Sequence, residues 1–279
     1  MHFQTQFLST TSGSGQAKQS PVTASHVTLL LMPRAAQPAD SFSLENPDLQ
    51  DAVEEVSAAT LKMRMLRKLA CGNKYEKAAR AQGASCIAGV DEVGRGALFG
   101  PVVAAAVILP PDTRIRGLRD SKQLVREDRE RLARVVEQKA LAIAIEEIDS
   151  ETIDRVNIYQ ATRLAMAAAV RKLTLAPDHL LIDAMRLDLE CVQTSIIYGD
   201  SLSISIAAAS VVAKVYRDRR MCEFHEIYPQ YGLASHKGYS TPEHLAALEK
   251  HGPSPLHRKS FRPVAQAPLP WGDPDPLPC

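Results

Sequence analysis

The sequence predicts an α/β fold built on a mixed sheet of five strands flanked by helices. Five short apolar runs have the length of buried strands, and longer segments with apolar residues at helical spacing alternate with them. The order is three strands, then helix, strand, strand and helix. Strands that lack a helical crossover are joined as hairpins, so the first three strands should be antiparallel and the sheet mixed.

The strands are expected where the chain is most apolar and bounded by glycine, proline or polar residues. The first covers residues 86–93, where Gly89 leaves room for another element to approach the backbone. The other four are expected at residues 102–109, 141–148, 179–182 and 193–198. Each run is short enough to be a strand and too short to be a helix of ordinary length.

Three segments of the same region are predicted to be helices. A charged helix covers residues 126–139, and one long helix runs from a cap at Ser150 to about Leu173. The third, over residues 204–226, is apolar on one side and ends with basic residues. These helices would cover the faces of the sheet.

The composition changes along the chain and predicts its domain organisation. Residues 1–45 are rich in Ser, Thr, Gln, Pro and Gly, which predicts a disordered extension. Residues 46–82 form an N-terminal helical segment whose basic later part either contacts nucleic acid or a partner or is a solvated face. A compact domain is expected at residues 83–263, and residues 264–279 are expected to be a flexible tail.

Charge and cysteine usage exclude some classes of protein. The net charge of +1 indicates no global affinity for nucleic acid, so any basic surface must be local. The five cysteines are scattered without a CxxC pair, which argues against a disulfide framework or a zinc knuckle and suits a reducing cytosol. The longest apolar runs are far short of a membrane span, and no signal peptide is evident. We therefore expect a cytoplasmic protein that does not bind membranes.

Four acidic residues follow short apolar runs. They are Asp91, Glu92, Asp183 and Asp200. Any one of them alone would be a turn or capping residue, but the ends of neighbouring strands meet at one edge of a sheet. Carboxylates that converge there repel one another unless cations are present, and oxygen ligands suit Mg²⁺ or Mn²⁺. The pattern predicts two-metal hydrolysis of a phosphodiester, with all four acids as catalytic metal ligands.

Several further motifs accompany these acids in a fixed order across the predicted catalytic domain. They occupy residues 89–96, 120–122, 181–183, 199–200, 205–218, 236–241 and 257–261. Together they closely resemble the ribonuclease HII family, the type 2 ribonucleases H, whose fold is RNase H-like. The resemblance also implies a C-terminal helical region.

By this resemblance the chain is an endonuclease that cuts the RNA strand of RNA–DNA hybrids, including single ribonucleotides embedded in duplex DNA. Cleavage would leave a 3′-hydroxyl and a 5′-phosphate. The four acids match the family's metal ligands, with Mn²⁺ or Mg²⁺ as the cofactor. We expect the chain to act as a monomer.

The resemblance also implies which residues contact the substrate. Gly94, Arg95 and Gly96 match the loop that reads the ribose 2′-hydroxyl, the group that distinguishes RNA from DNA. Tyr239 matches a tyrosine that stacks beneath the junction, or alternatively is a core aromatic beside Gly238.

Three more residues are candidate phosphate contacts. Ser121 and Lys122 either contact phosphate at a helix start or simply cap it. Lys214 either contacts phosphate or projects from its helix.

Two departures from the family pattern lie near the acids. Tyr198 precedes Gly199 where lysine is usual, which removes one nearby cation. Ala184 follows Asp183 where glycine is common, which makes that turn less permissive.

Two other functions are considered beside the leading one. A type 3 ribonuclease H shares the fold but usually has lysine in the position of Arg95 and a folded N-terminal binding domain, which residues 1–45 do not resemble. A hybrid-binding protein without catalysis is the second, and the retention of all four acids argues against it.

Overall fold

The computed structural model describes residues 71–267. The predictions for residues 1–45, for the helix that begins near Asn46, and for residues 268–279 of the tail lie outside this part of the chain. Within residues 71–267 the chain alternates strands and helices around one central sheet.

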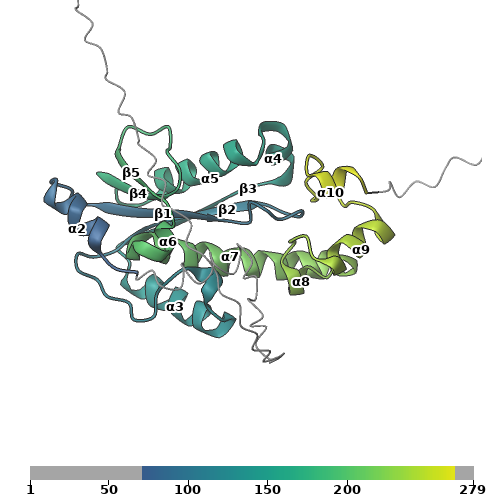
Figure 1. Ribbon diagram of the computed structural model, residues 1–279, viewed down its shortest axis with the longest axis horizontal. Coiled ribbons are helices and arrows are strands. Elements are labelled where there is room, and N and C mark those ends of the chain that lie inside the picture. The colour runs from purple at the N-terminus through teal and green to yellow at the C-terminus, as the bar shows by residue number, and fades with distance from the viewer. Residues whose placement is uncertain (1–70, 268–279) are drawn as a thin grey trace, which may run out of the picture. The chain divides into compact units, whose positions relative to one another are not determined.

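A mixed five-stranded sheet forms the centre of this region (Figure 1). Its strands are β1 Ile87–Val93, β2 Val102–Ile108, β3 Ala142–Ile148, β4 His179–Asp183 and β5 Val192–Ile196, in the order β3-β2-β1-β4-β5. β1, β2 and β3 pair antiparallel, whereas β4 runs parallel to both β1 and β5. The α/β fold class and the mixed sheet are confirmed. The predicted antiparallel pairing of the first three strands is confirmed. A direct hairpin between the second and third strands is wrong, because the charged helix predicted at residues 126–139, α3, lies in that connection.

Helices cover both faces of the sheet, with α5 on one face and α7 and α3 on the other (Figure 1). The helices before β4 are α2 Lys74–Ala81, η1 Ser121–Gln123, α3 Arg126–Lys139, α4 Ser150–Val156 and α5 Ile158–Lys172. Those after β5 are α6 Gly199–Leu202, α7 Ile204–Ile227, η2 Pro229–Tyr231, α8 Leu233–His236, α9 Pro242–His251 and α10 Arg262–Ala265. The predicted C-terminal helical region is present. No helix within residues 71–267 is long and apolar enough to cross a membrane.

β2 shows how the core divides between the two faces. All of its residues are buried. Val103, Ala105 and Val107 join the cluster that contains α3 and α7, whereas Ala104 and Ile108 join the cluster that contains α5. A strand covered on both faces is expected to be apolar at every position rather than at alternate positions.

α7 differs from the one-sided helix predicted for residues 204–226. Every residue from Ile204 to Ala213 is buried, because this half of the helix passes directly over β1. A Cβ atom at Gly89 would lie 2.0 Å from the backbone carbon of Ser205, so only glycine permits this approach. The close approach predicted at Gly89 is therefore confirmed.

The long helix predicted from Ser150 to Leu173 is two helices. Asn157 has a φ of 71° and separates α4 from α5, and its side chain accepts a hydrogen bond from the Gln160 N–H at 3.1 Å. The cap of α4 is Asp149 rather than Ser150, since Asp149 Oδ1 accepts from the Thr152 N–H at 2.7 Å. The ψ of Asn157 is 161°, so its backbone departs from the helical conformation, and its side chain caps the helix that follows.

Two segments outside the boundaries predicted for the catalytic domain pack against it. α2 precedes residue 83, yet Ala79 shares a buried cluster with Ile87 of β1 and Ile206 of α7. Val264, in the segment predicted to be a flexible tail, is buried beside Leu98 and Leu248.

Candidate active site

β1 and β4 bring three of the four predicted acids to one edge of the sheet. Val90 of β1 pairs with Ile182 of β4, so Asp91 and Asp183 follow at the same level of neighbouring parallel strands. Asp91 is 3% exposed, and its Oδ1 accepts the Glu92 backbone N–H at 2.8 Å. The strand pairing therefore brings these carboxylates close together.

The fourth acid reaches the same place by a different route from the one predicted. Asp200 is the second residue of the short helix α6, and β5 ends at Ile196 rather than delivering the acid itself. The backbone N–H of Gly199 donates to Asp183 Oδ1 at 2.8 Å, which ties α6 to β4. Tyr198 turns the chain between β5 and α6 with a φ of 59°.

The pKa values of the first two acids reflect this crowding. Burial raises the pKa of Asp91 well above its usual value, and Glu92, Asp183 and Asp200 raise it further, against a hydrogen bond from Ser210. Burial also raises the pKa of Glu92, although the neighbouring Arg95 guanidinium opposes this. Ionising both groups together is costly without a cation nearby.

The other two acids behave in the same way, and a fifth acid contributes. Burial raises the pKa of Asp183 against the hydrogen bond from Gly199. Burial and the neighbouring Asp120 raise the pKa of Asp200 to about 6. Asp120 is buried at the start of η1, where its Oδ1 accepts the Lys122 N–H at 2.9 Å. It was not among the predicted site residues, although it lies in the 120–122 motif that contributed to the family resemblance.

The four acids fit a divalent cation by their chemistry. They offer oxygen ligands alone, and Glu92 Oε2 is buried without a hydrogen-bond partner in the described chain. Within residues 71–267, no three Asp, Glu, His or Cys side chains already form an arrangement that could hold a metal ion. Two protein cations pair with the acids instead: Arg95 Nη1 lies 3.2 Å from Glu92 Oε1, and Lys122 Nζ lies 3.6 Å from Asp200 Oδ2.

An open cleft of about 710 Å³ lies beside the acids. All seven residues predicted to contact substrate line it, together with Glu92: Gly94, Arg95, Gly96, Ser121, Lys122, Lys214 and Tyr239. Asp91 adjoins the cleft through Ser210, which also lines it. The structure therefore unites residues that are up to about 150 positions apart in sequence in one surface feature.

Comparison with known proteins identifies the family to which the chain belongs. The family model described as Ribonuclease HII matches residues 88–264. A Ribonuclease HII of Koribacter versatilis (strain Ellin345) is 57% identical over 226 residues, which cover 81% of this chain and 89% of the relative. The chain belongs to the ribonuclease HII family. As a ribonuclease HII it is an endonuclease that acts on the RNA strand of RNA–DNA hybrids, so the type 3 and non-catalytic alternatives are set aside.

Solved structures share the RNase H-like fold of this ribonuclease HII. The ribonuclease H2 from Pyrococcus horikoshii OT3 aligns with a TM-score of 0.57 and 24% identity, covering 65% of this chain and 96% of that one. Bst-RNase HIII in complex with Mn²⁺ aligns with a TM-score of 0.52 and 21% identity, covering 67% and 70%. At these identities the likeness concerns the fold.

Within this ribonuclease HII, the two glycines of the 94–96 loop differ in what surrounds them. Gly94 has a φ of 88°, and a Cβ there would lie 2.2 Å from Arg217 Nε. Gly96 has no atom within 4 Å of an added Cβ and is exposed. The protein itself requires glycine at the first position, whereas the second faces open space in the cleft.

Two fully buried arginines hold the walls of the cleft and were not singled out by the sequence. Arg217 donates to the carbonyls of Pro101, Phe99 and Lys237 at 3.1, 3.2 and 2.9 Å. Arg258 donates to the carbonyls of Arg95 and Gly100 at 2.9 and 3.0 Å. Both residues lie inside motifs that carried the family resemblance, which was the available signal.

Tyr239 and Lys214, for which the sequence left alternatives open, both lie at the cleft. Tyr239 is half-buried, lines the cleft, and lies with its ring centroid 5.5 Å from the Arg217 guanidinium. Lys214 is 14% exposed, pairs with Asp218 at 2.7 Å, and lies 5.7 Å from the Tyr239 ring. Lys214 therefore does not simply project into solvent.

Ser121 and Lys122 occupy different environments. Ser121 is buried and its Oγ lies 3.0 Å from Ser210 Oγ, so it supports the floor of the cleft. The Lys122 side chain is 75% exposed. Loss of hydration beside the neighbouring groups would by itself lower the pKa of Lys122, but the surrounding acids, Asp91 foremost, together raise it by more.

Ala184 adopts a left-handed backbone conformation. Glycine, the residue common at this position in the family pattern, would adopt it without cost. The φ of Ala184, directly after Asp183, is 49°. An L-residue in this region loses roughly 1–2 kcal/mol relative to the right-handed region. The turn after Asp183 therefore forms with a positive φ even though alanine is a less favourable residue than glycine for it.

Proposed function

We propose that Asp91, Glu92, Asp183 and Asp200 bind Mg²⁺ or Mn²⁺, and that the chain cuts at single ribonucleotides in duplex DNA as well as in hybrids. Cleavage would leave a 3′-hydroxyl and a 5′-phosphate. The observation that carries this proposal is the convergence of the four carboxylates beside the cleft, at the ends of β1 and β4 and the start of α6. Burial and mutual repulsion raise the pKa of these acids, which agrees with that geometry. Such a cluster is fully ionised at neutral pH only when cations offset its charge.

The comparison with Bst-RNase HIII supports the choice of cation, because that protein of the same fold was solved in complex with Mn²⁺. Held by these four acids, cations of this kind would supply activation of the attacking water and charge stabilisation of the leaving oxygen. The chain's own groups keep the acids in place: the Gly199 N–H orients Asp183, and Ser210 donates to Asp91.

Recognition of the ribose is assigned to the 94–96 loop and Tyr239. A 2′-hydroxyl must be met by polar groups already in position, and a main chain without side chains offers its N–H and C=O groups most closely. The open space at Gly96 leaves room for this approach. Tyr239 offers a ring face on which the sugar or base at the junction can stack.

Lys122 is the best-placed phosphate contact. Its exposed ammonium group lies beside Asp200, at the border between the acids and the cleft. There it can hold the phosphate that undergoes cleavage by charge-assisted hydrogen bonds.

The first prediction tests the acids. Asp91→Asn and Asp183→Asn should each lower cleavage of a duplex with one embedded ribonucleotide by at least about 100-fold, the effect of losing one preorganised electrostatic group. Cleavage is measured with Mg²⁺ or Mn²⁺, and binding of an uncut hybrid is measured separately and should persist. Asp188→Asn, an exposed acid away from the cleft, is the matched control and should cut normally.

The substrate claim is tested in the same assay by replacing the single ribonucleotide with deoxyribose or a 2′-O-methyl ribose. Both replacements should abolish cleavage. Near wild-type cleavage by either acid variant, or equal cleavage of the deoxyribose duplex, would contradict the proposal.

A further inference from the structure

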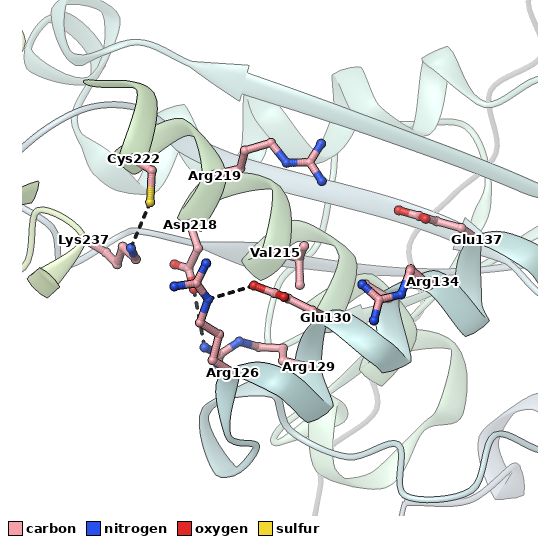
Figure 2. Close-up of a pocket in the computed structure, with 11 residues that line it drawn as sticks. Arg126, Arg129, Glu130, Arg134, Glu137, Val215, Asp218, Arg219, Cys222 and Lys237 are labelled. Atoms are coloured by element: carbon pink, nitrogen blue, oxygen red, sulfur yellow. Dashed lines mark hydrogen bonds and ion pairs between the residues drawn. The ribbon is translucent and has the colours of Figure 1, made fainter. Parts of the chain in front are cut away.

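A second cavity, of about 450 Å³, lies between α3 and α7 (Figure 2). We call it the α3–α7 groove. Arg126, Arg129, Asp218 and Lys237 line both this groove and the cleft, so the two hollows adjoin.

The groove carries an excess of positive charge. Five of the side chains that line it are Arg or Lys, and three are Asp or Glu. The negative charges of two of these acids are balanced by ion pairs. Arg126 Nε donates to Glu130 at 2.8 Å, and Asp218 accepts from Arg129 at 3.4 Å. Asp218 is offset a second time by Lys214.

Two arginines of the groove form no ion pair with an acid in the described part of the chain. Arg134 on α3 and Arg219 on α7 are exposed and line the groove from its two walls (Figure 2), and neither forms an ion pair among residues 71–267. Arg131 and Arg220, neighbours on the same helices that do not line the groove, do form ion pairs. Of the four arginines that line the groove, Arg126 and Arg129 are therefore ion-paired, whereas Arg134 and Arg219 are not.

We propose that the α3–α7 groove binds the phosphodiester backbone of the substrate duplex beyond the point of cleavage. This inference rests on the proposed function, because it takes the position of the substrate from the cleft. Duplex nucleic acid carries about one charge per 1.7 Å of its axis, so a duplex held in the cleft continues as a polyanion past its end. The guanidinium fork matches phosphate geometry, and the lining has no aromatic side chain to stack on a base.

The consequence is a length-dependent and sequence-independent contribution to affinity. Contacts to phosphates position a duplex without reading its bases. A duplex long enough to reach the groove should therefore bind more tightly than one that ends within the cleft. The length of duplex on one side of the ribonucleotide should matter more than the length on the other.

The test uses the full chain and its double variant Arg134→Ala/Arg219→Ala. Binding of a long duplex with one central ribonucleotide is measured by fluorescence anisotropy in the presence of a chelator, over a range of salt concentrations. The variant should bind about tenfold more weakly at low salt, and the slope of log Kd against log salt should fall by about 2, nearly one for each phosphate that the variant no longer neutralises. Arg131→Ala is the matched control on α3 and should leave both quantities unchanged.

A second arm locates the contact on the substrate. Single phosphates are replaced one at a time by uncharged methylphosphonates along both strands. Replacements that weaken binding by the wild-type protein but not by the double variant identify the phosphates that the groove contacts. Such positions should lie on one side of the ribonucleotide only.

The proposal would be overturned if the double variant kept the wild-type salt slope and melting temperature. It would also be overturned if Arg131→Ala weakened binding as much as the double variant does. The same measurement on a uniform RNA–DNA hybrid needs neither metal nor cleavage. It therefore separates failure of the groove from failure of the proposed cleavage at single ribonucleotides.

Discussion

At the scale of single residues, substitutions of Gly94 and Gly96 distinguish a glycine that the fold requires from a glycine that substrate binding requires. Gly94→Ala should destabilise the protein by about 2–4 kcal/mol, since it places an L-residue at positive φ and a Cβ against Arg217. Gly96→Ala should change stability by less than about 1 kcal/mol, because nothing lies within 4 Å of its added Cβ. It should nevertheless lower kcat/KM at an embedded ribonucleotide by about tenfold or more, because the methyl group displaces the substrate.

Chemical denaturation and cleavage kinetics on the same preparations measure these two effects. Gly72→Ala is the control, since its added Cβ also meets nothing within 4 Å and the residue does not line the cleft. If Gly96→Ala cuts as fast as the wild type, the ribose does not approach this residue.

The residues of the site were predictable to different degrees. The four acids were found because each follows an apolar run, which is a local signal. The two buried arginines were not found, because burial of a charged side chain depends on contacts more than 100 residues away, such as Arg217 with Phe99. Asp120 was not assigned to the site either, because its proximity to Asp200 arises only in the fold. A sequence shows the type of such a residue but not the carbonyl groups around it.

At the scale of elements, α2 contributes a cap to a helix distant in sequence. Glu76 is buried, and its Oε1 accepts from Ser203 Oγ at 2.6 Å and from the Ser205 N–H at 3.0 Å, at the start of α7. Ser203 in turn accepts from the Ile206 N–H. A carboxylate at the positive end of α7 stabilises both the helix and its junction with α6, which carries Asp200.

The prediction is that Glu76→Ala destabilises the protein by about 1–3 kcal/mol, because it leaves buried donors of Ser203 and Ser205 without an acceptor. Glu76→Gln retains one oxygen acceptor and should cost less. Thermal and urea unfolding provide the measurement, and Glu249→Ala, an exposed glutamate on α9, should have almost no effect. Equal stability of Glu76→Ala and the wild type would show that the cap is unimportant.

Element type was predictable here, but element ends were not. The strands and the charged helix α3 appear where apolar runs and helical spacing indicated. The break at Asn157 was missed because α4 and α5 share a continuous apolar pattern, and only the backbone of one residue interrupts it. The burial of α7 on all sides was missed because its small residues give little periodic signal, and the covering elements are distant in sequence.

At the scale of the whole described region, a chain of hydrogen bonds joins the C-terminal helices to Tyr239. The Ser254 N–H donates to His257 Nδ1 at 2.9 Å, so the proton of His257 lies on Nε2 and is directed at His244 Nε2, 3.1 Å away. His244 must then carry its proton on Nδ1, which donates to the Tyr239 carbonyl at 3.0 Å. This order requires both rings to be neutral.

The pKa values follow from that requirement. Burial lowers the pKa of His257 to about 3, with a further effect from His244, and burial also lowers the pKa of His244. A histidine whose pKa is lower in the folded state binds fewer protons there than in the unfolded chain. Its contribution to stability is therefore intact above its unfolded pKa, about 6.5, and is lost as the pH falls toward the folded value.

The prediction compares the wild type with His257→Asn, in which Asn retains an acceptor for the Ser254 N–H but does not titrate. The difference in unfolding free energy between the two should shrink by about 1–2 kcal/mol from pH 7 to pH 5, since each titrating histidine contributes at most about 1.4 kcal/mol per pH unit. The acids of the active site titrate in both proteins, so their opposite effect cancels in the difference. Urea unfolding at both pH values measures it, and His244→Asn provides an independent second comparison. A difference that stays constant between pH 7 and pH 5 in both variants would show that these histidines do not have to be neutral for the region to fold.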